Sequence, residues 1–378
     1  MIKDNILHKI LHMYQQSQAD EIVDMTLSSS FLKPNQNIID QLKNTLDDEI
    51  VYTYSPGAYQ QKFKACFIEY INNLYSVKLK DSQILPCGGT NQIIASTLFS
   101  LLENGDTVLL PSPGYPAYQT GAQAFHLDIY NYNTMNSSEE ISQEIITKIN
   151  SVKPKLVLLN FPNNPTGKML TQAQYKAIIK ASRENNCIIL NDCILNDFDF
   201  YQDKFSIFNT ADSFENILEL HSFSKAHALS GIRVGCIYGD EKLLHSVRNA
   251  RYIYEFDLGS LALNAGILTM QRGQEMVQYT RSYVKENLNV LTKTLKETNT
   301  DYIRPEGGVS ILAKLPVKHI NAQEFCLQFY EQYGIKVLPG TIYGNGFNDV
   351  FRITLMQKRQ AFYKFSEKYK AYLDKLKA

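Results

Sequence analysis

The sequence has no long run of apolar residues and no excess of charge of either sign. Its 378 residues include 38 lysines and arginines, which balance 38 aspartates and glutamates. A chain without net charge has no general electrostatic attraction to nucleic acid or to an anionic membrane surface, so we expect neither partner and predict a small-molecule one. No stretch approaches the roughly 18 consecutive apolar residues of a membrane-spanning helix.

Cysteine is sparse and irregularly spaced. None of the six cysteines forms a Cys-x-x-Cys pair, and in a chain of this length that pattern favours reduced thiols over a disulfide framework. Residues 1–20 carry Lys3, Asp4 and His8 among apolar residues, without the uninterrupted apolar core of a secretory signal. We therefore expect a cytoplasmic protein and predict no metal site.

The densest group of reactive residues is the stretch SFSKAHALSGIRVG, residues 222–235. A lysine amine such as Lys225 can form a Schiff base with a carbonyl compound. The hydroxyls of Ser222 and Ser224 can donate to a phosphate, and the planar guanidinium of Arg233 can pair with the same phosphate. Each part is common alone, but together they indicate one ligand that carries both a carbonyl and a phosphate.

This stretch resembles the lysine signature of the class I aminotransferases, which are fold-type I enzymes dependent on pyridoxal 5'-phosphate (PLP). The resemblance extends over almost the whole chain, with six motifs in the family order. It implies an aminotransferase that moves an amino group between an amino acid and a 2-oxo acid, with Lys225 bound to the cofactor. It also implies a homodimer whose active sites are shared between the subunits.

Two further motifs are similar to the family's phosphate contacts. In the run at residues 84–106, glycines lead directly into an apolar-periodic helix, so free N–H groups and the positive helix end suit a phosphate. A tight turn explains the glycines equally well, but Gly89 and Thr90 match the family's phosphate cup. Tyr54 matches the tyrosine that reaches the partner subunit's cofactor phosphate, with Tyr52 as the alternative.

An aromatic ring and an amide follow two strand-like runs. Tyr115 follows the run DTVLLPSP and matches the ring that stacks on the pyridine in relatives, with Tyr118 as the nearby alternative. Asn164 lies in NNPTG after a continuous apolar run, which suits a strand covered on both faces. It matches the asparagine that bonds the cofactor's phenolic oxygen, although Asn-Pro with glycine is also general turn chemistry.

Two charged residues complete the expected site. Asp192 ends the buried run CIILND, where a carboxylate would hold a proton on the pyridine nitrogen, an interaction of roughly 4 kcal/mol at 4 Å and an effective dielectric near 20. Arg352 in VFRITL matches the arginine that binds the substrate α-carboxylate through two parallel hydrogen bonds; a surface arginine at a strand edge is the alternative. The family's Asp-x-x-Tyr tyrosine is absent, because Leu195 stands at its position.

Strand-like runs alternate with helical patterns, which predicts an α/β fold: the fold-type I PLP transferase architecture with a mainly parallel, doubly wound sheet. Ligands should gather at the carboxyl ends of its strands. We expect a large PLP-binding domain at residues 46–270 and a small α+β domain at residues 271–378. Residues 1–45 would form an N-terminal arm, with an amphipathic helix at 1–14, and part of the small domain.

Other PLP chemistry competes with transamination. Leu195, the serine run at residues 28–30 and the segment VLPGTIYG are similar to capreomycidine synthase-like enzymes, so a PLP-dependent lyase, cyclase or oxidase of an amino acid is the alternative. A non-enzymatic binding module ranks below both, because no basic patch or DNA-binding extension accompanies the motifs. The sequence does not identify the amino acid.

Overall fold

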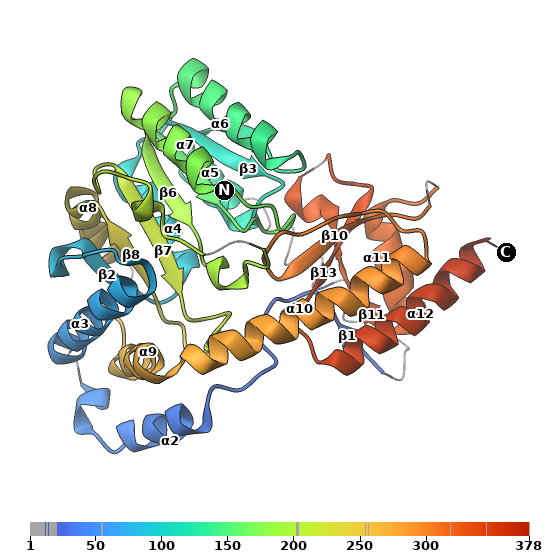
Figure 1. The fold of residues 1–378 in the computed structure, drawn as a ribbon, viewed down its shortest axis with the longest axis horizontal. Coiled ribbons are helices and arrows are strands. Elements are labelled where there is room, and N and C mark those ends of the chain that lie inside the picture. Colours follow the sequence, from blue (N-terminus) through green and yellow to red (C-terminus); the bar gives the residue numbers. More distant parts are fainter. Residues whose placement is uncertain are drawn as a thin grey trace.

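A computed structural model describes residues 12, 14, 21–53, 56–201, 204–253, 255, 257–317, 319–344 and 346–377. Its largest element is a seven-stranded sheet with helices on both faces (Figure 1). In spatial order the strands are β2 (Ile84–Cys87), β8 (Gly235–Gly239), β7 (Ile217–Ser222), β6 (Ile188–Asp192), β5 (Leu156–Asn160), β3 (Thr107–Ser112) and β4 (Asp128–Asn133).

One strand of this sheet runs against the others. Strand β8 pairs antiparallel with both β2 and β7, whereas β3, β4, β5, β6 and β7 pair in parallel. Strand β2 therefore runs in the same direction as β7. The carboxyl ends of six strands and the beginning of β8 share one edge, so the predicted mainly parallel sheet is confirmed and a residue just before β8 joins the residues that follow the other strands.

The strands are buried on both faces, as their continuous apolar runs predict. In β5, Val157 and Leu159 join one apolar cluster while Leu156 and Leu158 join the other, because successive side chains of a strand point to opposite faces. The first cluster is covered by α3 (Pro56–Tyr75), α6 (Ser138–Val152), α7 (Gln172–Glu184) and α9 (Ser260–Arg272), and the second by α4 (Thr90–Leu101), α5 (Pro116–Ala124) and α8 (Glu241–Arg251).

The last third of the chain forms a second layered unit together with the N-terminal segment. Its antiparallel sheet has the order β12 (Leu338–Pro339), β13 (Val350–Thr354), β10 (Ser310–Lys314) and β9 (Tyr302–Ile303). Strand β1 (Val23–Asp24) pairs in parallel with β11 (Ile335–Lys336), so residues 21–28 lie beside strands far away in the chain. Three helices pack here: α10 (Gln274–Glu297), α11 (Ala322–Tyr333) and α12 (Arg359–Lys377).

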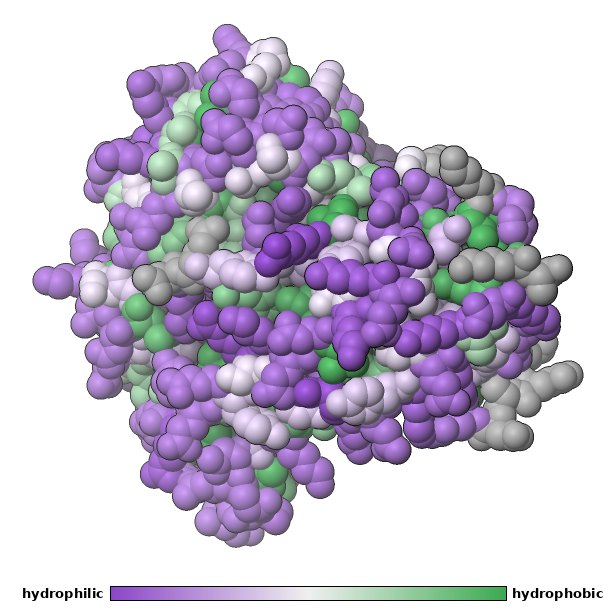
Figure 2. All heavy atoms as spheres, turned by 45° about the vertical axis from the view of Figure 1, so that its right-hand side comes forward, coloured by the Kyte–Doolittle hydropathy of each residue, from purple (hydrophilic) through white to green (hydrophobic). Residues whose placement is uncertain are grey.

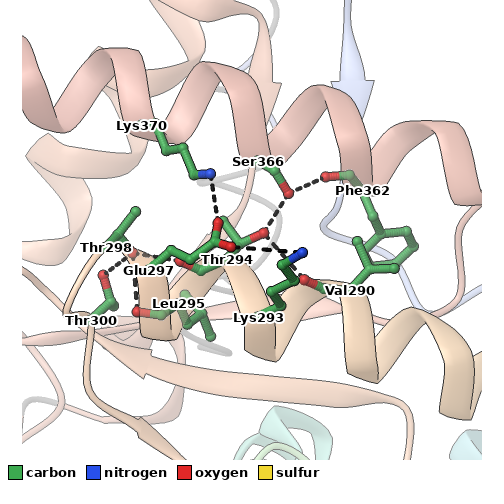
Figure 3. Close-up of polar contacts among 10 residues, drawn as sticks. All are labelled: Val290, Lys293, Thr294, Leu295, Glu297, Thr298, Thr300, Phe362, Ser366 and Lys370. Carbon is green, nitrogen blue, oxygen red and sulfur yellow. Dashed lines mark hydrogen bonds and ion pairs between the residues drawn. The ribbon is translucent and has the colours of Figure 1, made fainter.

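Helices α10 and α12 run side by side in Figure 1 and exchange polar contacts, drawn in Figure 3. The hydroxyls of Thr294 and Ser366 lie 2.5 Å apart, and Lys370 Nζ lies 2.6 Å from Glu297 Oε2. Because that ion pair is largely exposed, it contributes little to stability. The apolar cluster beneath, which includes fully buried Phe362, supplies most of the stabilisation.

The surface is mixed. On the face in Figure 2 hydrophobic residues form small areas between hydrophilic ones, and none of the helices within the described residues is long and apolar enough to cross a membrane. All six cysteines are free, and all but Cys66 are buried. The amphipathic helix predicted at residues 1–14 lies outside the described residues, apart from positions 12 and 14. The domain boundaries stay a prediction.

Helix α2 (Gln36–Thr45) lies against α9, where the Asn264 amide donates to the Thr45 hydroxyl across 2.7 Å. The Asn35 side chain accepts from the Asn37 N–H and begins the helix. The segment between β1 and α2, residues 25–35, contains no helix or strand. It crosses from the second sheet to the helices of the first, and so passes the edge where the candidate site lies.

Candidate active site

A cavity of about 170 Å³ opens at the carboxyl edge of the large sheet. Seven of the residues predicted from sequence line it: Thr90, Tyr115, Asn164, Ser222, Ser224, Lys225 and Arg233. Three others touch a lining residue: Gly89 lies under Arg233, Asp192 bonds Tyr118, and Arg352 bonds Ser28. Tyr54 lies outside the described residues, so its predicted role stays a prediction.

The strand register explains why distant motifs meet. Gly235, the first residue of β8, lies opposite Cys87 at the end of β2 and opposite Ser222 at the end of β7. The loop after β2 therefore lies beside the loop after β7 and the residues that precede β8. Asn160 and Asp192 end the next two strands and lie opposite each other.

Gly89 and Arg233 form one end of the cavity. A Cβ at Gly89 would overlap the Arg233 guanidinium, so the arginine lies directly over a glycine backbone. Gly89 has φ +103° and precedes α4, whose N-terminus has no side-chain cap. The free N–H groups of this helix end and the guanidinium form a cradle suited to a phosphate.

The loop between Ser222 and Arg233 is tied by its own hydrogen bonds. Arg233 Nη1 donates to the Ser230 carbonyl across 2.9 Å, and Ser230 Oγ donates to the Ser224 carbonyl across 2.6 Å. The Ser224 N–H donates to Ser222 Oγ across 3.2 Å. These bonds fix the loop that carries Lys225 and present its serine hydroxyls to the cavity.

The Lys225 amine lies in the cavity and donates to the Ser28 carbonyl oxygen across 2.5 Å. Burial lowers the pKa of this amine to about 8, helped by the positive charges of Arg352 and Arg233. A neutral amine is the nucleophilic form, so this environment makes Lys225 far more reactive at neutral pH than an exposed lysine.

Asp192 lies behind the cavity wall and is only 1% exposed. The Tyr118 hydroxyl donates to its Oδ2 across 2.6 Å, and the Ile194 N–H donates to its Oδ1 across 3.3 Å. Burial raises the pKa of Asp192 to about 6, and both hydrogen bonds oppose that rise. The carboxylate is therefore mostly ionised at neutral pH while it lies in an apolar environment.

The two tyrosines weighed from sequence have different positions. Both line the cavity: Tyr115 lies at the start of α5, whereas Tyr118 is 2% exposed and bonds Asp192. Their rings meet edge to face with centroids 5.6 Å apart, which is a favourable aromatic geometry. The Tyr118 contact could not be inferred from sequence, because it joins a helix to a strand end 74 residues away.

Asn160 organises the asparagine loop after β5. Its Oδ1 accepts from the Asn164 N–H and its Nδ2 donates to the Asp192 carbonyl, each across 3.0 Å. The Asn164 amide oxygen is buried without a hydrogen-bond partner among the described residues. A buried polar atom of this kind calls for a ligand partner. The sequence signal for Asn160 is a single polar residue that ends a buried apolar strand.

Arg352 lies on β13 and is 6% exposed. It donates to the Thr26 carbonyl across 3.3 Å and to Ser28 Oγ, and the Tyr343 hydroxyl is also hydrogen-bonded to it. These partners are uncharged, and its Nε is buried without a partner in the described part of the chain. Because a buried cation normally has an anionic partner, this guanidinium is poised to bind an anionic ligand.

Comparisons with known proteins identify relatives of this chain. A family model for aminotransferase class I and II matches residues 24–362. The LL-diaminopimelate aminotransferase of Natranaerobius thermophilus is 26% identical over 348 residues, which are 90% of this chain and 89% of that protein. Transaminase BacF of Bacillus subtilis is 24% identical over 353 residues, covering 91% and 87% of the two chains.

Solved structures show the same fold. The substrate-bound structure of Bacillus subtilis BacF has a TM-score of 0.85 at 21% identity and covers 97% of this chain and 93% of its own. A probable N-succinyldiaminopimelate aminotransferase from Thermus thermophilus also reaches 0.85 at 21% identity, with 96% and 99% covered. Because the family model spans most of the sequence, this chain belongs to the class I and II aminotransferases, enzymes of PLP fold type I that transfer amino groups between amino acids and 2-oxo acids.

Proposed function

We propose that Lys225 is the residue that binds the PLP aldehyde carbon and later moves the substrate proton. The observation that carries this assignment is a buried amine that lies in the cavity, with its pKa lowered to about 8 by burial and by the nearby charges of Arg352 and Arg233. PLP supplies an electron sink for amino-acid chemistry when it is bound.

Several residues fit the cofactor. The cradle of Gly89, Thr90 and Arg233 suits its phosphate, with hydroxyls from Ser222 and Ser224 nearby. Asn164 lines the cavity, where its amide NH2 group would donate to the phenolic oxygen, and Tyr115 offers an aromatic face in the wall. These donors and surfaces complement the polar groups of a flat, phosphorylated pyridine.

Asp192 would hold the ring nitrogen protonated. With its pKa raised to about 6, the carboxylate is mostly ionised at neutral pH, and its poor solvation strengthens attraction to a neighbouring cationic nitrogen. Tyr118 fixes the carboxylate in one orientation through the 2.6 Å hydrogen bond. A protonated ring nitrogen is what makes the pyridine a strong electron sink.

Lys225 and Arg352 would divide the work on the substrate. Arg352 would bind the α-carboxylate, because its buried guanidinium has only uncharged partners among the described residues. Once it no longer holds the cofactor, the Lys225 amine would take the proton from the substrate α-carbon and carry it as an ammonium group until its return. Its lowered pKa keeps a useful fraction neutral at pH 7 to 8.

The rest of the wall combines uncharged polar and apolar side chains, and its apolar part favours a neutral substrate side chain. Ile194, Leu195 and Val309 line the cavity. In the described part of that wall, Lys225 and Arg233 are the charged residues, and both already have roles. We therefore favour an amino donor with an uncharged side chain over the diaminopimelate named for the relatives. Leu195 also leaves the phenolic oxygen without the hydroxyl donor that an Asp-x-x-Tyr pattern would supply.

We also propose a cytoplasmic homodimer in which Tyr54 reaches the partner's cofactor phosphate. Tyr52 is 73% exposed and Ile253 is 68% exposed. The segments that follow them are joined by a hydrogen bond from Gln60 to Asp257. Exposed apolar side chains on neighbouring segments support a second copy as their cover, and free, mostly buried thiols suit a reducing compartment.

The test is an amino-transfer assay on the PLP-loaded protein with each common amino acid and a 2-oxo acid acceptor. We expect a matching 2-oxo acid from donors with uncharged side chains, and no transfer by Lys225→Ala. Release of ammonia or a cyclised product without an acceptor would instead favour the lyase or cyclase alternative. Transfer confined to diaminopimelate would contradict the proposed side-chain preference.

A further inference from the structure

Ser28 contacts both groups to which the proposed function assigns the two ends of a substrate amino acid. Its carbonyl oxygen accepts from Lys225 Nζ across 2.5 Å, and its hydroxyl oxygen accepts from Arg352 Nη2. Ser28 also lines the cavity. This single residue therefore lies between the amine and the guanidinium, where the carboxylate of a substrate has to enter.

The hydroxyl of Ser28 is held in place although the residue belongs to a loop. Thr354 Oγ1 lies 3.0 Å from Ser28 Oγ and is itself bonded by the Met356 N–H across 3.1 Å. On β13, Arg352 and Thr354 point to the same face, because they are two residues apart in a strand, while Phe351 and Ile353 join the apolar cluster. Two neighbouring side chains of one strand thus position the serine.

Hydrogen-bond capacity shows what the serine can still do. A hydroxyl has one donor and two acceptor positions. Arg352 occupies one acceptor position of Ser28, and the Ser28 proton can turn either to Thr354 or to a new acceptor. A carboxylate bound to the Arg352 guanidinium would lie beside Ser28 Oγ and present an ionised oxygen, which is a stronger acceptor than a neutral hydroxyl.

We propose that Ser28 is a substrate-binding residue whose hydroxyl donates to the α-carboxylate on Arg352, with Thr354 as its positioning residue. The inference rests on the proposed function, because it takes Arg352 as the carboxylate site. In the protein without cofactor or substrate, Ser28 hydrogen-bonds both the Arg352 guanidinium and the Lys225 amine. Attachment of Lys225 to the cofactor would remove the second contact, and the substrate carboxylate would then share the guanidinium with the Ser28 hydroxyl.

The experiment compares two small probes, of which only aminooxyacetate carries a carboxylate. Neither probe has a side chain that would need a pocket. Aminooxyacetate and O-methylhydroxylamine both attack the cofactor carbon of the PLP-loaded protein. In each case the aminooxy nitrogen forms the new carbon–nitrogen bond, the bond to Lys225 breaks, and the lysine leaves as a free amine. No oxidant or reductant is consumed. The second-order rate constant of each reaction is followed by absorbance.

We expect Ser28→Ala to slow the reaction with aminooxyacetate about tenfold or more, as for the loss of one hydrogen bond to a charged group. Its reaction with O-methylhydroxylamine should change less than about twofold. Ser28→Thr keeps the hydroxyl and should retain most of the aminooxyacetate rate. Thr354→Val should lose part of the preference for aminooxyacetate over O-methylhydroxylamine. Thr354→Ser keeps the hydroxyl and should retain that preference.

The matched control is Ser30→Ala, since Ser30 lies in the same segment and its hydroxyl accepts from the Leu32 N–H. This variant should behave as the wild type with both probes. Equal slowing of both probes in Ser28→Ala, or no change with either, would overturn the inference. A wild-type protein whose bound cofactor releases a lysine other than Lys225 would instead overturn the proposed function, so the two failures are distinguishable.

Discussion

The Tyr118 hydroxyl donates to Asp192 across 2.6 Å and joins helix α5 to the end of strand β6. The carboxylate is buried, and burial raises its pKa to about 6 although this hydrogen bond lowers it. The tyrosine therefore helps to keep a poorly solvated carboxylate ionised at neutral pH. We regard the pair as one unit, in which Asp192 provides the charge and Tyr118 holds it in position.

Tyr118→Phe should weaken PLP binding. Without the hydroxyl the pKa of Asp192 rises above about 6, so less of the carboxylate is ionised at neutral pH to hold the ring nitrogen. We expect a loss of roughly 10-fold in cofactor affinity, the magnitude of one hydrogen bond to a charged group. The measurement is a titration of apo protein with PLP; unchanged affinity at pH 7.5 would contradict the paired role.

Asp192→Asn should stabilise the apo protein at neutral pH. The pKa of Asp192 is raised from 3.8 to about 6 in the folded state, so the folded protein binds this proton more tightly than the unfolded chain. This tighter proton binding stabilises the folded protein fully below pH 3.8, and the stabilisation is lost as the pH rises through about 6. Above pH 6 the buried carboxylate costs up to about 3 kcal/mol of unfolding free energy, which the neutral asparagine avoids.

Urea unfolding of the apo protein measures this effect at pH 7.5 and pH 4.5. We expect Asp192→Asn to have a larger free energy of unfolding than the wild type at pH 7.5, with a smaller difference at pH 4.5. The variant should also bind PLP more weakly. Asp128→Asn is the control, because Asp128 is exposed on the edge strand β4. A variant less stable than the wild type at pH 7.5 would show that the carboxylate stabilises the empty protein.

The reactivity of Lys225 in the apo protein should titrate near pH 8. Burial and two arginines lower the pKa of this amine from 10.5 to about 8, so its neutral fraction becomes large as the pH rises through that value. Trace acetylation with acetic anhydride, followed by peptide mass spectrometry, measures the midpoint. Arg352→Gln should move it upward, because one of the nearby positive charges is removed; a midpoint above pH 10 in the wild type would contradict the burial argument.

Gly89→Ala should impair binding of the phosphate more than binding of the ring. Its Cβ would overlap the Arg233 guanidinium, and φ of +103° is strained for alanine. We expect the apo protein to lose about 10-fold or more in affinity for PLP and much less for pyridoxal, which lacks the phosphate. Gly346→Ala is the control, because a Cβ there meets no atom within 4 Å. Equal losses for both ligands would argue against the cradle.

The sequence predicts the strands whose side chains are buried on both faces of the sheet. Continuous apolar runs identify β5 and β6, because both faces of each strand are buried. Strand β4, with the sequence DIYNYN, was missed since it lies at the sheet edge, where Tyr132 is its one fully buried side chain.

The candidate site was predictable where a residue type and a strand end coincide. Lys225, Asp192 and Asn164 follow or end buried strands, and the shared carboxyl edge brings them together. The contacts of Ser28 were beyond sequence reasoning, because they depend on how a loop packs against a strand about 320 residues later. The same holds for Tyr118, whose role depends on the helix position and not on a motif.

The most direct test of the account is to identify the lysine that carries the cofactor. PLP-loaded protein is reduced with borohydride, digested, and analysed by peptide mass spectrometry. We expect the phosphopyridoxyl group on the peptide that contains Lys225, and no such adduct in Lys225→Ala. A reduced adduct on another lysine, or none in a protein that binds PLP, would contradict the assignment of Lys225 and the mechanism derived from it.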